Sequence, residues 1–210
     1  MLSKHLAPRK PPRQDRSRAT VEAIVEAAVD LLSSRGYARV STNQIAARAG
    51  VSVGSLYQYF PNKDAIVTVL FQRHAGGVER IVEATLADLR QPDVPLREAL
   101  HRMLLGFQAL HDENPKVARA VDPLTDGRQQ FVEIMLRREE RFRQELTEAL
   151  RGRADVRRGN HVIMASLLFD IVEAVTRSLM HGDARRFERK QALAEATEML
   201  CRCVESPGDA

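Results

Sequence analysis

The side chains best suited to specific polar contacts lie close together, in residues 42–66. This segment holds two of the three tyrosines of a 210-residue chain that contains no tryptophan. Tyr57 and Tyr59 stand beside Ser55 and Gln58, on what reads as a small polar helix next to a turn. Hydroxyl and amide groups donate and accept hydrogen bonds, so the chemistry that this segment favours is recognition by hydrogen bonding.

The spacing of small and apolar residues in the same segment predicts a helix-turn-helix. Counted from Thr42 as the first position, Ala46 is fifth, Gly50 ninth and Leu56 fifteenth. The fifth position must be small because the second helix crosses close to it, and the ninth must tolerate a positive φ. Apolar contacts between the two helices are expected from Ile45, Ala49, Val51 and Leu56.

The second helix of this motif is predicted to expose Val53, Gly54, Ser55, Gln58 and Tyr59, with Tyr57 alongside. Small and hydrogen-bonding groups of this kind can approach base edges in the major groove of DNA. The tyrosines are then expected at the margin of the groove, Phe60 in the core, and Lys63 on the phosphate backbone. The alternative is a small helical hairpin whose aromatic side chains are ordinary core.

The charge of the chain is unevenly distributed. Residues 1–63 carry ten Lys or Arg against four Asp or Glu, whereas residues 64–210 carry 22 against 24. A basic end on a nearly neutral body favours a polyanionic partner. The first eighteen residues, taken alone, could equally be a solubilising tail.

The stretch "RSRATVEAIVEAAVDLLSSRGYARVSTNQIAARAGVSVGSLYQYFPNKDAIVTVL" resembles the DNA-binding domain of TetR-type transcriptional regulators. The resemblance covers about residues 16–70, and "GVSVGSLYQYFPNKDAI" is its most specific part. It implies an all-helical homodimer that binds a palindromic operator on double-stranded DNA, usually as a repressor. Such a repressor releases DNA when a small molecule binds its C-terminal domain.

The same resemblance implies roles for individual residues. Phosphate contacts are implied for Thr42, Tyr57, Tyr59 and Lys63. Base contacts are implied for Val53, Ser55 and Gln58, with Gly54 allowing close approach. An N-terminal arm of about sixteen residues, with four Lys or Arg before Arg16, lies outside the usual pattern. This arm either reaches DNA or is disordered.

Apolar spacing is helical almost throughout, so we expect an all-α fold of roughly nine helices. The predicted parts are a basic arm (1–15), a three-helix DNA-binding domain (16–62) and a helical effector-binding and dimerisation domain (63–210) that a long fourth helix joins to it. Gly36 is expected to end the first helix, and Thr42 and Ser52 to cap the second and third. The segment "ENPKVARAVDP" is expected to hold one or two turns.

The last two long helices, at about 160–181 and 184–204, are the expected dimer seam. The first is apolar on more than one side and the second carries an apolar stripe, so one surface should meet its own subunit and another its twin. The residues of this pattern are Val162, Ile163, Leu167, Leu168, Ile171, Val172, Val175 and Leu179, then Leu193, Met199, Leu200, Cys203 and Val204. Burial wholly within one subunit is the alternative.

An effector site is expected among the helices at 95–111, 127–151 and 160–181. Candidate lining residues are Met103, Phe107, Phe131, Met135, Phe142 and Met164, although each of them taken alone is more often ordinary core. Arg138 interrupts the apolar face that Phe131, Met135 and Phe142 share. It could pair with Asp170 or Glu173, or it could recognise an anionic ligand.

Other function classes lack support in the sequence. No G-x-S-x-G or G-x-x-x-x-G-K motif is present, so we expect no enzyme and no cofactor. Cys201, Cys203 and six scattered histidines give no metal-binding spacing, and the longest apolar run is far shorter than the ~20 residues of a membrane span. We expect a bacterial cytoplasmic protein that associates with the nucleoid when bound to DNA. The remaining alternatives are an architectural DNA-binding protein without an effector, and a helical enzyme or carrier.

Overall fold

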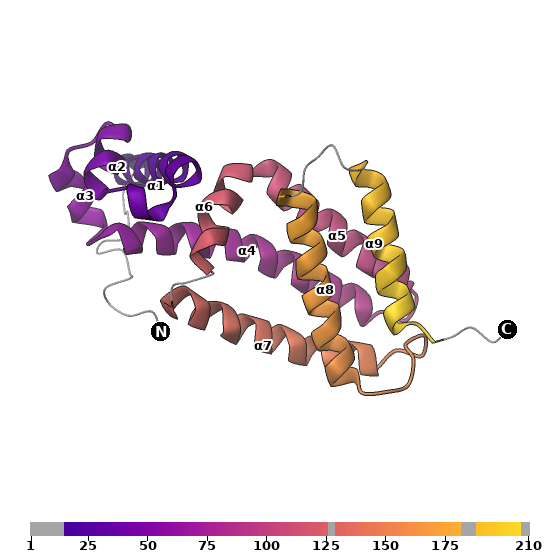
Figure 1. Cartoon of the computed structure of the whole chain (residues 1–210). Helices are drawn as coiled ribbons and strands as arrows, with labels where there is room; N and C mark the ends of the chain where they lie inside the picture. Colours follow the sequence, from indigo (N-terminus) through magenta and orange to yellow (C-terminus); the bar gives the residue numbers. More distant parts are fainter. Residues whose placement is uncertain (1–14, 126–128, 182–187, 207–210) are drawn as a thin grey trace. The chain divides into compact units, whose positions relative to one another are not determined.

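The computed structural model describes residues 15–125, 129–181 and 188–206. Within the helices, nothing is described of the side chains of 15–16, 122–125, 129–137, 177 and 179–181. The described residues form nine α-helices and one 3-10 helix, with no strand among them, which confirms the predicted all-α class (Figure 1). Among these residues, extended backbone pairs once, in an isolated bridge between Val156 and Glu205. The predicted arm lies outside the described residues except for Asp15.

The order of elements follows the predicted pattern closely (Figure 1). In chain order they are α1 (Asp15–Arg35), η1 (Tyr37–Arg39), α2 (Thr42–Arg48), α3 (Val53–Tyr59), α4 (Lys63–Leu89), α5 (Leu96–Glu113), α6 (Pro115–Thr125), α7 (Gln129–Arg151), α8 (His161–His181) and α9 (Arg189–Val204). None of the helices described is long and apolar enough to cross a membrane.

The chain divides into two compact units, and the division cuts α4 between Gly76 and Gly77. The head unit is the chain up to Gly76 together with Asn114–Glu133. The body unit is Gly77–Glu113 together with Ile134–Ala210. Two chain segments that are distant in sequence therefore build each unit, and α6 belongs to the head.

Two glycines shape the turns of the head unit. Gly36 follows α1 with φ of 73°, and Gly50 follows α2 with φ of 68°. Residues that carry a Cβ rarely adopt this left-handed backbone conformation, which is why both turns need glycine. After the turn at Gly50, Leu56 and Phe60 are fully buried, as is Ile45 of α2. The predicted turn and the burial of Phe60 are confirmed.

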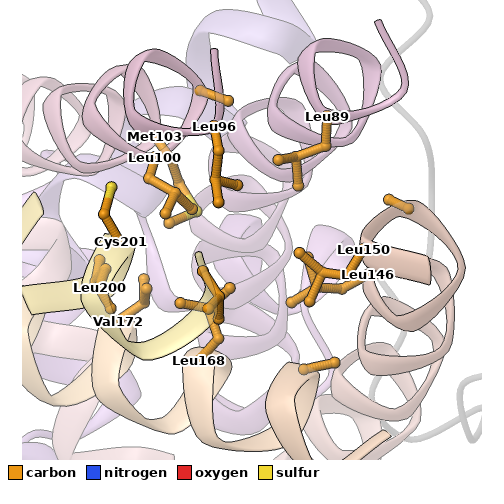
Figure 2. Close-up of a cluster of buried hydrophobic side chains, with 14 of the residues drawn as sticks. Leu89, Leu96, Leu100, Met103, Leu146, Leu150, Leu168, Val172, Leu200 and Cys201 are labelled. Atoms are coloured by element: carbon orange, nitrogen blue, oxygen red, sulfur yellow. The ribbon is translucent and has the colours of Figure 1, made fainter. Parts of the chain in front are cut away.

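A single apolar cluster holds the body unit together (Figure 2). Leu100 and Met103 of α5 meet Leu168 of α8 and Leu200 of α9, while Leu150 closes the cluster from α7. Burial of a large aliphatic side chain contributes about 1.5–3 kcal/mol, so this cluster is the main source of stability for the unit. Helices α5, α8 and α9 contact one another through it.

Three local predictions were wrong or incomplete. The N-cap of α2 is Ser41 rather than Thr42, because Ser41 and Gln44 form a reciprocal capping box. Helix α6 has 11 residues, about three turns rather than one or two, since Pro115 begins it and the helix continues past Pro123. The 3-10 turn η1 was not predicted, because three residues are too few to show a period.

Candidate nucleic-acid interface

Helix α3 presents a short polar face that its own cap holds in place. The Ser52 hydroxyl accepts a hydrogen bond from the backbone N–H of Ser55 at 3.0 Å, which confirms Ser52 as the N-cap. The hydroxyls of Ser52 and Ser55 lie 2.8 Å apart. Gly54 and Gln58 are exposed, and Val53 keeps an exposed fraction of 39% although valine is apolar. An exposed valine among polar groups suits contact with a base methyl group or sugar edge.

Thr42, the first residue of α2, contacts the exposed polar face of α3. Oγ1 of Thr42 lies 3.0 Å from the hydroxyl of Tyr57, so the two helices present these groups as a pair. Tyr57 is 39% exposed, and Tyr59 is partly buried. The structure therefore brings Thr42 and Tyr57 together. The contact spans 15 residues, so the spacing within either helix does not predict it.

Lys63 lies at the start of α4, where its ammonium group meets the protein's own backbone. Nζ donates hydrogen bonds to the carbonyls of Tyr37 at 2.7 Å and Val40 at 2.5 Å. It also lies 3.7 Å from the centroid of the Tyr37 ring, a cation–π contact. The Tyr37 hydroxyl in turn donates to the Asp64 carboxylate. In the free protein Lys63 thus joins η1 to α4.

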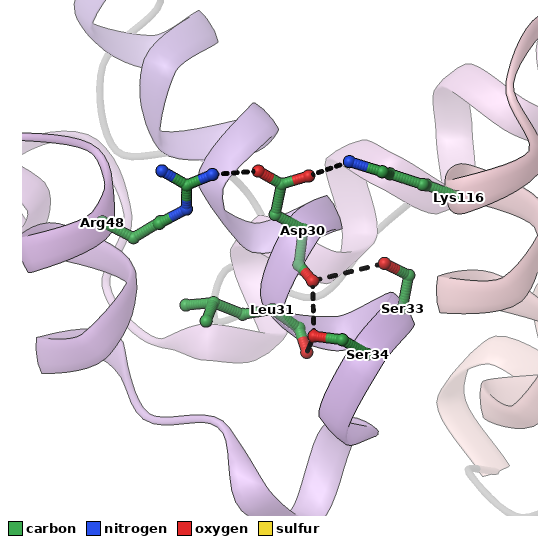
Figure 3. A network of polar contacts seen from close by, with 6 residues as sticks. All are labelled: Asp30, Leu31, Ser33, Ser34, Arg48 and Lys116. Atoms are coloured by element: carbon green, nitrogen blue, oxygen red, sulfur yellow. Dashed lines mark hydrogen bonds and ion pairs between the residues drawn. The ribbon is translucent and has the colours of Figure 1, made fainter.

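A second set of charges ties the helix-turn-helix to its support (Figure 3). The Asp30 carboxylate on α1 accepts from Arg48 of α2 at 2.7 Å and from Lys116 of α6 at 2.6 Å. The hydrogen bond from Lys116, followed by that from Arg48, holds the pKa of Asp30 below its ordinary value. This carboxylate therefore stays charged at neutral pH and links three helices of the head.

A bidentate ion pair fixes the first half of α4 against α1. Nη1 and Nη2 of Arg73 donate to the two oxygens of the Glu22 carboxylate, at 2.5 and 2.7 Å. These bonds lower the pKa of Glu22. The head thus presents a small, capped polar helix on supporting helices that ion pairs join to one another. This is the geometry of a domain that binds in the major groove of DNA.

Comparison with known families decides between this reading and a plain helical hairpin. The family described as "Bacterial regulatory proteins, tetR family" matches residues 24–70, which include all of α2 and α3. The family described as "Tetracyclin repressor-like, C-terminal domain" matches residues 95–203 of the 210. The chain belongs to the TetR family. It is a DNA-binding transcriptional regulator.

Individual relatives of this TetR-family chain are also transcriptional regulators. It is 36% identical over 72 residues to the uncharacterized regulator YvkB of Bacillus subtilis, a match that covers 34% of this chain and 38% of that protein. It is 27% identical over 121 residues to the fatty acid metabolism regulator protein of the same bacterium, covering 42% and 62%. The chain therefore spans less than two thirds of the length of these relatives.

Solved structures of the family share the fold over nearly the whole chain. The complex of SmeT with triclosan has a TM-score of 0.71 at 22% identity, covering 90% of this chain and 93% of that one. NalD of Pseudomonas aeruginosa has a TM-score of 0.69 at 21% identity, covering 94% and 100%. A TetR-like regulator from Rhodococcus sp. RHA1 has a TM-score of 0.66 at 27% identity, covering 92% and 97%.

The predicted seam residues of the TetR-family body divide into two sets. Leu168, Leu200 and Val204 are buried in the body cluster, together with Val172 and Leu193. Val162, Ile163, Leu167 and Met199 are instead more than half exposed. Leu168 and Leu200 therefore lie on the surface that packs within the chain, not on one open to a second copy. The side chain of Leu179 and residues 182–187 lie outside the described part of the chain.

The candidate effector residues lie among the same helices. Met103 and Met164 are buried in the body cluster, and Phe107 and Phe142 pack against it. Phe131 and Met135 lie in α7, but their side chains are outside the described residues. Arg138 does not form its predicted pair with Asp170. Its Nε lies 3.4 Å from Glu79 of α4, whereas Asp170 is paired with Arg143 at 2.8 Å.

Three residues that hold the head together were not predicted from the sequence: Ser41, Tyr37 and Asp30. The capping box of Ser41 with Gln44 was readable, because serine and glutamine stand three residues apart. No local signal identifies the other two. Asp30 meets Lys116 across 86 residues and Tyr37 meets Asp64 across 27, so only the packing of helices brings them together. Among the described residues, His, Cys, Asp and Glu do not gather in a metal-binding group.

Proposed function

We propose that this chain is a ligand-responsive repressor that acts as a homodimer on a palindromic operator. The observation that carries the proposal is the exposed polar face of α3, which the Ser52 cap and the Thr42–Tyr57 contact hold in place. Val53, Ser55 and Gln58 would read bases, and Gly54 would allow close approach. Phosphates would be held by Thr42, Tyr57, Tyr59 and Lys63.

The exposed apolar residues of α8 and α9 support dimerisation. Val162, Ile163 and Leu167 of α8 and Met199 of α9 each keep 54–62% of their surface exposed. Large apolar side chains gathered on two helices favour a protein partner. A second copy would place two recognition helices about one DNA turn apart, ~34–36 Å, which requires a palindromic site.

Two relatives support repression and response to a ligand. SmeT is described as the repressor of a Stenotrophomonas maltophilia multidrug efflux pump and has been solved with triclosan. NalD is described as a secondary repressor of an efflux pump. For this chain, repression and response to a ligand are both part of the proposal.

The test begins with the protein and sheared genomic DNA of its host. We expect the full chain to retain a small set of fragments, whose sequencing should reveal a palindrome with half-sites one turn apart. An operator duplex should then shift in electrophoresis, and a small-molecule library should contain compounds that release it. Retention of DNA without sequence preference, and no release by any compound, would instead identify an architectural DNA-binding protein.

A further inference from the structure

Two buried polar atoms of the body unit have no hydrogen-bond partner. They are Nη1 of Arg138 on α7 and Oγ1 of Thr176 on α8, and no other described side chain buries such an atom unpaired. A buried donor that has lost its hydration without gaining a partner is unfavourable, and native structures satisfy most such groups. Two buried polar atoms without partners, on two contacting helices, therefore require an explanation.

Thr176 differs from the buried threonines elsewhere in the chain. Thr68, Thr85, Thr147 and Thr197 are all buried, and each hydroxyl donates to the carbonyl four residues earlier at 2.7–2.8 Å. This local bond is available to any threonine within a helix. The Thr176 hydroxyl does not make it, although Val172 stands four residues earlier in the same helix.

Arg138 differs in the same way from two other arginines of the body. Arg153 is 6% exposed, and its guanidinium donates to the Asp155 carboxylate and to three backbone carbonyls. Arg143 donates to Asp170 and to the Ser166 carbonyl, and it lies over the Phe169 ring. In Arg138, only Nε lies near a described carboxylate: it is 3.4 Å from Oε1 of Glu79.

Helices α7 and α8 meet at a pair of aromatic rings. The rings of Phe142 and Phe169 pack there, with centroids 5.4 Å apart. Arg138 lies one turn before Phe142 and Thr176 two turns after Phe169, so each shares a helix face with one of the rings. Aromatic surface and two unused hydrogen-bonding groups thus occur on one pair of helix faces.

The charges around Arg138 oppose an anionic ligand. Glu79 already stands beside its guanidinium, and Arg143 already balances Asp170. Burial, followed by the nearby carboxylate of Glu173, raises the pKa of Glu139 above its ordinary value. A ligand carboxylate would add negative charge to a region that is already rich in it. A neutral oxygen could accept from Nη1 without that cost.

We propose that the effector is an uncharged aromatic molecule bearing a hydroxyl or carbonyl oxygen, which accepts a hydrogen bond from Nη1 of Arg138 and exchanges one with the Thr176 hydroxyl. This inference rests on the proposed ligand response and narrows it to a chemical class. The apolar part of the molecule lies against the phenyl rings, and the oxygen supplies the partner that both buried atoms lack.

The first test needs no ligand. Thr176→Val removes an unpaired hydroxyl, whereas the matched control Thr147→Val removes one that is bonded at 2.7 Å. We expect the thermal unfolding midpoint to rise by about 2–4 °C for Thr176→Val and to fall for Thr147→Val. An equal fall in both variants would show that the Thr176 hydroxyl is satisfied in the free protein, which would overturn the inference.

The second test compares three probes on one ring system by calorimetry: 1-naphthol, naphthalene and 1-naphthoate. The full chain should bind 1-naphthol roughly tenfold more tightly than naphthalene, and 1-naphthoate most weakly. Arg138→Met and Thr176→Val should each weaken 1-naphthol roughly fivefold and alter naphthalene less than twofold. Preference for 1-naphthoate, equal affinity for naphthalene, or binding of none of the three would overturn the inference.

Release of operator DNA is measured on the same samples, so that the two proposals can fail separately. If library compounds release DNA but the three probes behave otherwise than expected, ligand response stands and this assignment of its chemistry falls. If 1-naphthol binds through Arg138 and Thr176 but no compound releases DNA, the site stands and the proposed switch falls.

Discussion

Oγ1 of Thr42 lies 3.0 Å from the hydroxyl of Tyr57, and this contact joins the first turn of α2 to the exposed face of α3. Both residues are proposed phosphate contacts, so the bond pre-orients two groups for one DNA strand. We expect Thr42→Val and Tyr57→Phe each to weaken operator binding roughly fivefold, about one hydrogen bond. Because the residues act together, the double variant should lose less than the product of the two. Fluorescence anisotropy on an operator duplex measures all three, and strict additivity would show that the contact has no role.

Lys63 is expected to serve both the fold and the DNA. Lys63→Ala should lower the free energy of unfolding by about 1–2 kcal/mol, because the carbonyls of Tyr37 and Val40 lose their donor. It should also reduce the log–log salt slope of operator binding by about 1 if the ammonium contacts a phosphate when bound. Urea unfolding and titrations at several salt concentrations separate the effects. Lower stability with an unchanged slope would leave Lys63 a structural residue only.

The dimer prediction now has a matched pair of substitutions on adjacent residues of α8. Leu167 is 54% exposed and Leu168 is 2% exposed. We expect Leu167→Glu, and likewise Met199→Glu, to give a folded monomer in sedimentation velocity that has lost most of its operator affinity. Leu168→Glu should instead unfold the body, since even truncation at a core leucine costs about 2–5 kcal/mol. A wild-type monomer at micromolar concentration would contradict the proposal.

Gly76 and Gly77, at the boundary between the two units, should respond differently to alanine. A Cβ on Gly76 would meet nothing within 4 Å, whereas one on Gly77 would lie 2.5 Å from Cδ1 of Leu110. Gly76→Ala should therefore raise the free energy of unfolding by about 1 kcal/mol, the difference in helix propensity. Gly77→Ala should gain less stability than Gly76→Ala, because its Cβ must displace the end of the partly buried Leu110 side chain. Urea unfolding measures both variants.

Gly76 is also the candidate compliant point between head and body. If α4 bends there on effector binding, Gly76→Ala should weaken ligand-induced release while changing ligand-free operator affinity by no more than a few-fold. Normal induction in this variant would exclude a hinge at Gly76. The contact with Leu110 makes Gly77 unsuitable for this test.

The Asp30 network predicts a specific pH dependence. Its hydrogen bonds with Lys116 and Arg48 depress the pKa of Asp30 in the folded state. The stabilisation is then fully present above the unfolded value, about 4, and is lost as pH falls through the lower folded value. We expect Asp30→Asn to be less stable than wild type at pH 7, with the difference shrinking below about pH 4. Glu26→Gln, at an exposed position on the same helix, is the matched control.

The sequence by itself determined the features that depend on near neighbours. Helical periodicity gave the order of the long helices, and the small-residue spacing gave the turn at Gly50 and the cap at Ser52. Each of these needs only a backbone preference or a hydrogen bond within four residues. The capping box at Ser41 was readable on the same ground.

Only the tertiary structure decided which partner each side chain meets. Leu167 and Leu168 are alike in sequence, but successive residues of a helix point about 100° apart, so one is buried in the body cluster and the other is exposed. Arg138 meets Glu79, and Lys63 meets the carbonyls of Tyr37 and Val40, because segments far apart in the chain pack together. Such pairings depend on the crossing of helices, which no local window of residues encodes.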